Sequence, residues 1–177
     1  HVFLQAFADP QGDGRIKALY FPNRRLPVRA DLFNFVSWQL QTRAGVKVFA
    51  WMPVLSFDLD PSLPRVQRRD RQTGQLHEAT EPYIRLSPWN PQVRQQVTDI
   101  YEDLARYSTF NGILFHDDAV LTDVDDAGQD AAQDTTRQKS RLLMGFTRAL
   151  GQAVKHIRGP QIKTARNMFV LPILEPE

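Results

Sequence analysis

The chain has 177 residues, a formal net charge of +2 and no cysteine. Its length suffices for one sizeable hydrophobic core or for part of a larger one. The lack of cysteine excludes disulfides and thiolate chemistry. The small net charge demands no polyanionic partner, and the scattered arginines argue against a nucleic-acid surface. No apolar run reaches about eighteen residues, so no membrane-spanning helix is predicted.

The N-terminal part alternates strand and helix. A strand is predicted over residues 2–8, and the Pro, Gly and Asp residues from Asp9 onward indicate a loop. A helix is predicted over residues 30–43, ended by Gly45. Its apolar face at helical spacing comprises Leu32, Phe33, Val36 and Leu40. A second strand over 46–51 ends at Trp51.

A long polar segment follows, over residues 58–91. It contains a predicted hairpin turn at 72–75 and carries Tyr83 near its end. Because loops of this length are usually functional or disordered, we interpret it as one wall of a cleft. A second helix is predicted over 91–107, with Asn90 as its N-cap.

The central stretch of the chain is an apolar strand with an acidic end. Residues 113–115 are predicted to be a buried strand, and four titratable residues follow within eight positions: His116, Asp117, Asp118 and Asp123. Residues 122–140 are polar, with little to bury, and we expect them to be mobile. A third helix is predicted over 137–157, and a fourth strand over 161–167 contains Arg166 and Asn167 near its end.

Strands that each return through a helix require parallel pairing. Two architectures meet this requirement: an open doubly wound sheet and a (β/α)8 barrel. No glycine-rich phosphate-binding motif follows any strand, and polar or aromatic residues end several strands. We therefore predict an α/β fold of the TIM-barrel type. The chain would hold about half of the barrel, so we expect residues 1–177 to be part of a longer protein.

Carboxylates beside aromatic residues are typical of glycoside hydrolysis, in which one acid protonates the leaving oxygen and another attacks the sugar or activates water. Neighbours in a strand point to opposite sides, so one of Asp117 and Asp118 is expected to act and the other to brace the strand end. Asp123 could be the partner carboxylate. The candidate catalytic residues are Asp117, Asp118 and Asp123. The candidate substrate-binding residues are Asp9, Trp51, Tyr83, His116, Arg166 and Asn167.

Two other chemistries are weaker alternatives. His116 with the adjacent carboxylates could bind a divalent ion, but no second histidine stands at ligand spacing, and we predict no metal in this chain. A Ser-His-Asp triad lacks a nucleophile elbow.

Five segments in order carry a family resemblance: residues 4–10, 19–23, 45–53, 116–119 and 163–167. Together they resemble the C-terminal domain of the PgaB family of poly-β-1,6-N-acetyl-D-glucosamine deacetylases from bacterial biofilm systems. The resemblance implies a (β/α) barrel with an elongated groove, in which Asp117, Asp118 and Asp123 form the acidic motif and Tyr83 and Trp51 the aromatic wall. It also implies an N-terminal, metal-dependent deacetylase domain that is not in this chain.

The resemblance implies an endo-glycosidase acting on the partly deacetylated polymer during its modification and export. The alternative is a non-catalytic polysaccharide-binding and export module. The implied partners are the polymer, the deacetylase domain and an outer-membrane export porin. The implied location is the periplasm, at the outer membrane, through a parent lipoprotein.

Overall fold

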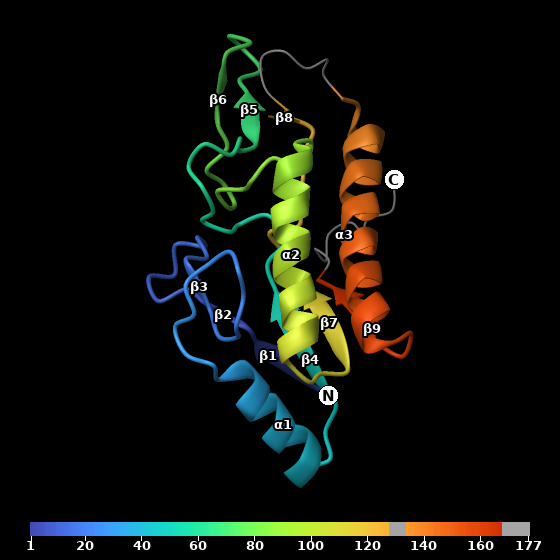
Figure 1. Cartoon of the computed structure of the whole chain (residues 1–177). Helices are drawn as coiled ribbons and strands as arrows, with labels where there is room; N and C mark the ends of the chain where they lie inside the picture. Colours follow the sequence, from blue (N-terminus) through green and yellow to red (C-terminus); the bar gives the residue numbers. More distant parts are fainter. Residues whose placement is uncertain (128–133, 168–177) are drawn as a thin grey trace.

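A computed structural model of the protein describes residues 1–127 and 134–167. Figure 1 shows its helices and strands in chain order. The strands are β1 (Val2–Gln5), β2 (Phe7–Ala8), β3 (Ala18–Leu19), β4 (Val48–Met52), β5 (Gln67–Arg69), β6 (Leu76–Glu78), β7 (Gly112–Phe115), β8 (Asp125–Asp126) and β9 (Lys163–Arg166). The helices are α1 (Phe33–Arg43), α2 (Pro91–Tyr107) and α3 (Thr136–Arg158).

A four-stranded parallel sheet, in the order β1-β4-β7-β9, forms the centre of the fold. The predicted parallel pairing is therefore confirmed. One row of paired residues crosses the sheet from Gln5 through Trp51 and Leu114 to Ala165. Because the strands run in the same direction, the loops that follow them meet at one edge of the sheet. Helices α2 and α3 lie side by side against this sheet (Figure 1).

Helix α2 matches its predicted bounds and its predicted cap. The Asn90 side chain accepts hydrogen bonds from the backbone N–H groups of Gln92 and Val93, and Pro91 occupies the first helical position. Its predicted apolar stripe is fully buried in the core and comprises Val93, Val97, Ile100, Tyr101 and Leu104. The opposite side of the helix is therefore free for polar contacts.

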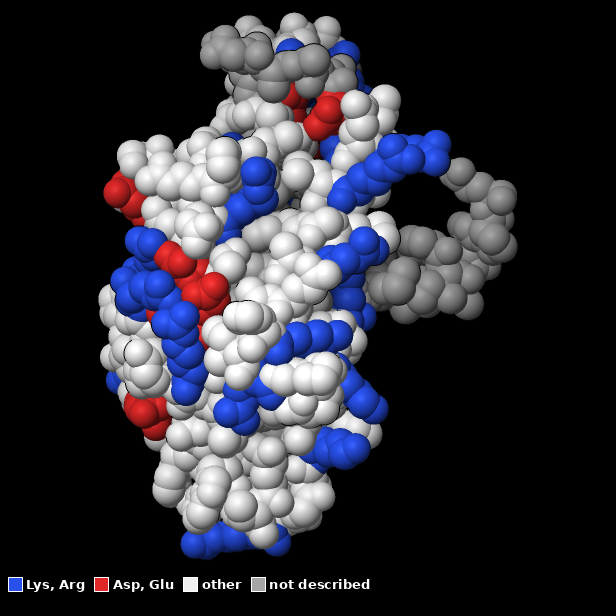
Figure 2. All heavy atoms as spheres, turned by 45° about the vertical axis from the view of Figure 1, so that its right-hand side comes forward, with Lys and Arg blue, Asp and Glu red and all other residues white. Residues whose placement is uncertain are grey.

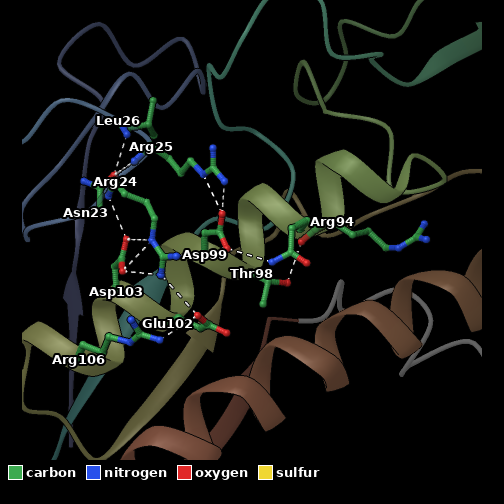
Figure 3. Close-up of polar contacts among 11 residues, drawn as sticks. Asn23, Arg24, Arg25, Leu26, Arg94, Thr98, Asp99, Glu102, Asp103 and Arg106 are labelled. Carbon is green, nitrogen blue, oxygen red and sulfur yellow. Dashed lines mark hydrogen bonds and ion pairs between the residues drawn. The ribbon is translucent and has the colours of Figure 1, made fainter.

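Those polar contacts tie the loop before α1 to α2 (Figure 3). The Arg24 guanidinium donates to both carboxylate oxygens of Asp103, at 2.8–3.2 Å, and Arg25 pairs with Asp99. Burial alone would raise the pKa of Asp99, but hydrogen bonds from Arg25 and Gln95 hold it below its usual value. The loop is thus fixed to the helix by charge-assisted hydrogen bonds.

Helix α1 departs from its prediction. It begins at Phe33 rather than at residue 30, and Leu32, expected on the buried face, is half exposed. The fully buried positions are Phe33 and Ser37. Ser37 is buried because its hydroxyl donates to the backbone carbonyl of Thr109. A hydrogen bond from a serine thus orients the helix, and a periodicity based on apolar residues does not detect it.

The long segment before α2 contains a small antiparallel sheet in the order β6-β5-β8. The predicted hairpin turn lies between β5 and β6. The expectation that residues 122–140 bury little is wrong for Asp125 and Asp126, which are buried in β8. Asp125 forms an ion pair with the fully buried Arg85, and Asp126 pairs with Arg69. Residues 128–133, which the same prediction covers, lie outside the described residues.

Helix α3 carries lysines and arginines along its length and no acidic residue. Its exposed cations include Arg137, Arg141 and Arg148. Figure 2 shows basic side chains spread over the face of the molecule that carries this helix. No helix in the described part of the chain is long and apolar enough to cross a membrane.

Candidate active site

The candidate site lies where the loops leave the carboxyl ends of the parallel strands. Asp9 follows β2, Trp51 lies near the end of β4, and His116 and Asp117 follow β7 directly. Tyr83 reaches the same place from the long segment before α2 and donates a hydrogen bond to Asp117. These five side chains, all predicted from the sequence, are brought together by the fold.

His116 is enclosed by three aromatic rings. The Trp51 ring stacks on its imidazole, with ring centroids 5.1 Å apart and planes 27° apart. Phe7 and Tyr83 meet the imidazole edge-on, at 5.6 and 5.4 Å. The His116 side chain is 15% exposed. The packing therefore fixes the orientation of the ring and leaves little of it in contact with solvent.

Asp117 is the carboxylate that the site presents to solvent. One of its oxygens lies 2.9 Å from Nδ1 of His116, and the other accepts a hydrogen bond of 2.9 Å from the Tyr83 hydroxyl. The Asp117 side chain is nevertheless 39% exposed. It is thus held on both oxygens and remains reachable by a ligand, which is the geometry required of a reacting carboxylate.

The protonation of Tyr83 and His116 follows from this arrangement. Burial, the hydrogen bond to Asp117 and the nearby carboxylates raise the pKa of Tyr83 to about 12, so its hydroxyl remains a donor at neutral pH. Burial alone would lower the pKa of His116, but Asp118, Asp117 and Asp9 together raise it above its usual value. When protonated, Nδ1 donates to Asp117; when neutral, it can accept from the backbone N–H of Asp118, 3.1 Å away.

The stability of the protein should therefore depend on the charge of His116. A folded-state pKa above the unfolded value means that its contribution is fully present below about pH 6.5 and is lost as the pH rises through the folded-state pKa. We expect the difference in unfolding free energy between the wild type and His116→Gln to shrink as the pH rises from 6 to 9. Urea denaturation at each pH measures it. His156→Gln, on the exposed side of α3, is the control, and a difference that stays constant with pH would contradict the prediction.

Asp118 is fully buried, and its Oδ1 lies 3.5 Å from Nδ1 of His116. Its carboxylate accepts hydrogen bonds from three consecutive backbone N–H groups, those of Val54, Leu55 and Ser56, with shortest distances of 2.9, 2.7 and 2.7 Å. It thereby holds the loop that follows β4. Of the two adjacent acids, Asp118 is placed to brace the loop and Asp117 to meet a ligand.

The remaining predicted residues lie apart from this cluster. Asp123 is 57% exposed and forms an ion pair with Arg71 of the β5–β6 hairpin. Arg166 donates a hydrogen bond to the carbonyl of Ala119, which follows the acidic pair. Asn167 is exposed at the end of β9. In the described part of the chain, no hydrogen bond or ion pair joins any of the three to His116 or Asp117.

Beside this cluster lies a hollow of about 240 Å³ that the sequence did not predict. Apolar and polar side chains share its lining, which comprises Phe7, Asp9, Gly12, Gly14, Ile16, Pro53, Ser56, Tyr83 and His116. Gly14 has φ +70°, and a Cβ there would lie 2.8 Å from the Tyr83 ring, so only glycine permits this approach. The glycines after Asp9 were the sequence signal that could have indicated a shaped cavity.

No metal-binding arrangement of three or more His, Asp or Glu residues occurs in residues 1–127 and 134–167. The chemistry available to the described residues is that of a partly exposed carboxylate, a buried imidazole and a phenol, beside an aromatic-lined hollow. Such a set of groups suits acid–base or nucleophilic attack on a polar ligand such as a sugar.

Comparisons with known proteins show the family of the chain. Two curated relatives, the poly-β-1,6-N-acetyl-D-glucosamine N-deacetylases of Escherichia coli K12 and O157:H7, are each 50% identical to the chain over 99% of its length. The chain spans 30% of the length of these relatives. The solved glycoside hydrolase domain of PgaB (BpsB) from Bordetella bronchiseptica matches 98% of the chain with a TM-score of 0.83 and 41% identity, and the chain covers 56% of that structure.

The structural match confirms the predicted fold class, an α/β fold of the TIM-barrel type of which this chain forms part. It also confirms the resemblance inferred from the five sequence segments. The model of the hypothetical glycosyl hydrolase family 13 matches residues 1–137. The chain therefore belongs to the hypothetical glycosyl hydrolase family 13 and is a glycosyl-hydrolase-like domain of the PgaB type.

Proposed function

We propose that this domain binds partly de-N-acetylated poly-β-1,6-N-acetyl-D-glucosamine and cleaves it internally. The observation that carries the proposal is the position of Asp117, held by Tyr83 and His116 yet open to solvent at the carboxyl ends of the parallel strands. The names of the relatives, one a deacetylase of this polymer and the other a glycoside hydrolase domain, supply the substrate class.

In this proposal Asp117 is the carboxylate that acts on the anomeric carbon or on a water molecule beside it. Tyr83 orients one of its oxygens, and His116, fixed by the stacked Trp51 ring, orients the other. Asp118 is fully buried, and its Oδ2 accepts from three backbone N–H groups, so it does not meet the ligand. Its role is to keep the loop after β4, and with it Ser56, in place.

The distribution of charge favours an amino sugar. Asp118, Asp117 and Asp9 raise the pKa of His116, which supports a site that favours positive charge. The helix α3, by contrast, has only basic charged residues, and Figure 2 shows more basic than acidic side chains on the face of the molecule that carries it. A polymer with free ammonium groups would be attracted to the acidic site and repelled from this face.

A second candidate function is polysaccharide binding and export without cleavage. One observation favours it: of the three predicted catalytic acids, only Asp117 is open at the site, while Asp118 is buried and Asp123 pairs with Arg71. A single carboxylate can bind an ammonium group, but glycoside hydrolysis ordinarily needs two carboxyl groups.

The proposal extends to the surroundings of the domain. Because the chain spans 30% of its curated relatives, which are deacetylases, we place it beside an N-terminal deacetylase domain. We further propose a periplasmic location, at the outer membrane through a lipoprotein parent, with an export porin as the partner that receives the polymer.

Product analysis decides between the two functions. The purified protein is incubated with defined β-1,6-linked oligosaccharides of mixed glucosamine and N-acetylglucosamine, and the products are separated by mass spectrometry. Hydrolysis predicts shortened oligosaccharides that increase with time. Binding without any shortened product, measured on the same samples by calorimetry, would overturn the hydrolase and support the binding module.

A further inference from the structure

Building on the proposed function, we propose that Asp9 and Ser56 form a specificity subsite for the free ammonium group of a glucosamine unit. Both residues line the hollow beside His116. The subsite would distinguish a de-N-acetylated sugar from an N-acetylated one. The subsite uses neither the Asp117 carboxylate nor the Tyr83 hydroxyl, which serve the proposed hydrolysis.

Asp9 and Ser56 each have a buried side-chain oxygen without a hydrogen-bond partner in the described part of the chain. Oδ1 of Asp9 and Oγ of Ser56 are buried, and neither makes a hydrogen bond within residues 1–127 and 134–167. Ser56 is only 3% exposed. A buried polar atom without a partner costs about 1–3 kcal/mol, and more if it is charged. Two such atoms lining one hollow indicate a place for a ligand that supplies hydrogen-bond donors.

Asp9 and Ser56 are both held in position without using these two oxygen atoms. The other carboxylate oxygen of Asp9 accepts a hydrogen bond of 3.1 Å from the backbone N–H of Gly14. The backbone N–H of Ser56 donates to Asp118 at 2.7 Å, which leaves its hydroxyl free. The orientation of both groups is therefore set before a ligand binds, which lowers the entropic cost of binding.

The carboxylate of Asp9 indicates that the ligand of this subsite is a cation. Asp9 places a carboxylate against apolar surfaces of Phe7, Ile16 and Pro53, where charge interactions are less screened than in water. The nearest cation of the site, His116, has its Nδ1 directed at Asp117, 2.9 Å away. Asp9 therefore retains a free acceptor for an ammonium group, and the Ser56 hydroxyl, unpartnered among the described residues, is a second acceptor in the lining of the same hollow.

An N-acetyl group fits this subsite less well. It has a single N–H donor, carries no charge, and adds a carbonyl oxygen and a methyl group. A hollow of about 240 Å³ is smaller than the pockets of about 300–1,000 Å³ that enclose whole drug-sized ligands. The hollow would thus accept one amino group and part of its ring, and the added acetyl group would bring an acceptor oxygen close to the Asp9 carboxylate.

The test compares two ligands on matched variants. Calorimetry measures binding of a fully de-N-acetylated β-1,6-glucosamine oligosaccharide and of its fully N-acetylated counterpart at constant pH and salt. For the wild type, we expect tighter binding of the de-N-acetylated form. Asp9→Asn should reduce that preference about tenfold or more, because a charge-assisted hydrogen bond is lost. Ser56→Ala, which keeps the backbone N–H, should reduce it by a smaller factor.

Asp13→Asn is the matched control, since Asp13 lies in the same loop, is exposed, and loses the same charge. It should keep the wild-type preference. If Asp9→Asn also keeps that preference while the wild type discriminates, the subsite assignment is wrong and the proposed function stands. If the wild type binds neither oligosaccharide, the proposed function itself fails. Circular dichroism checks each fold, and Ser56→Ala decides the question if Asp9→Asn does not fold: an unchanged preference in Ser56→Ala would then overturn the assignment.

Discussion

Asp117→Asn is expected to lower the rate of oligosaccharide hydrolysis by about 10²–10⁴-fold, the usual contribution of a positioned acid or base. The substitution keeps the size of the side chain and one oxygen acceptor, but it removes the charge and the ability to transfer a proton or attack as a carboxylate. Asp117 is partly exposed and sits between Tyr83 and His116. The measurement is the initial rate of product formation at saturating substrate, together with calorimetric binding of the same oligosaccharide.

The control for this prediction is Asp123→Asn. Asp123 is exposed and paired with Arg71 on the hairpin, and surface ion pairs of this kind contribute little to stability. We expect its rate to stay within about twofold of the wild type, because its carboxylate takes no part in the cluster. A rate loss in Asp123→Asn equal to that of Asp117→Asn, with binding retained in both, would show that Asp123, in the segment between β7 and β8, also takes part in the reaction.

Much of the fold could be predicted from local patterns alone. Helix α2 shows why: its cap Asn90, its first residue Pro91 and its apolar stripe all lie within one short segment, so local chemistry determines both its bounds and its buried face. The parallel order of β1, β4, β7 and β9 followed from the helices between them. Helix α1 was less predictable, because the buried position of Ser37 depends on a carbonyl far along the chain.

The candidate site was predictable in composition but not in the role of each acid. Alternation along a strand indicated that Asp117 and Asp118 point to opposite sides, but it could not say which faces the loop after β4. Asp123 pairs with Arg71, which lies 52 positions earlier in the chain. Arg71 is on a hairpin whose orientation no local sequence pattern predicts. The hollow beside Asp9 also requires segments distant in sequence, since Ser56 and Tyr83 complete it. Such long-range contacts determine which candidate residues come together in one site, and local sequence patterns do not predict them.

The assignment of Asp118 as a brace leads to the second large effect. Asp118→Asn should lower the free energy of unfolding by about 3 kcal/mol or more. The carboxylate accepts from three backbone N–H groups at Oδ2, and from one of them also at Oδ1, whereas the amide puts a neutral oxygen in place of the charged one and an NH₂ group at the second position, facing the Val54 N–H. A hydrogen bond to a charged group contributes about 1.5–3 kcal/mol and one between neutral groups about 0.5–1.5 kcal/mol, so the loss of charge weakens all three bonds, and full burial prevents water from compensating.

The same substitution at the preceding residue provides the comparison. Asp117→Asn should cost about 1 kcal/mol or less, because that side chain is partly exposed and water can satisfy its neighbours. Urea denaturation followed by circular dichroism measures both variants. Equal losses of stability would show that the two acids share one structural role. A large loss confined to Asp118→Asn would instead mean that one acidic pair combines two functions, because the buried carboxylate fixes the loop that carries Ser56, while its neighbour remains free to meet the ligand.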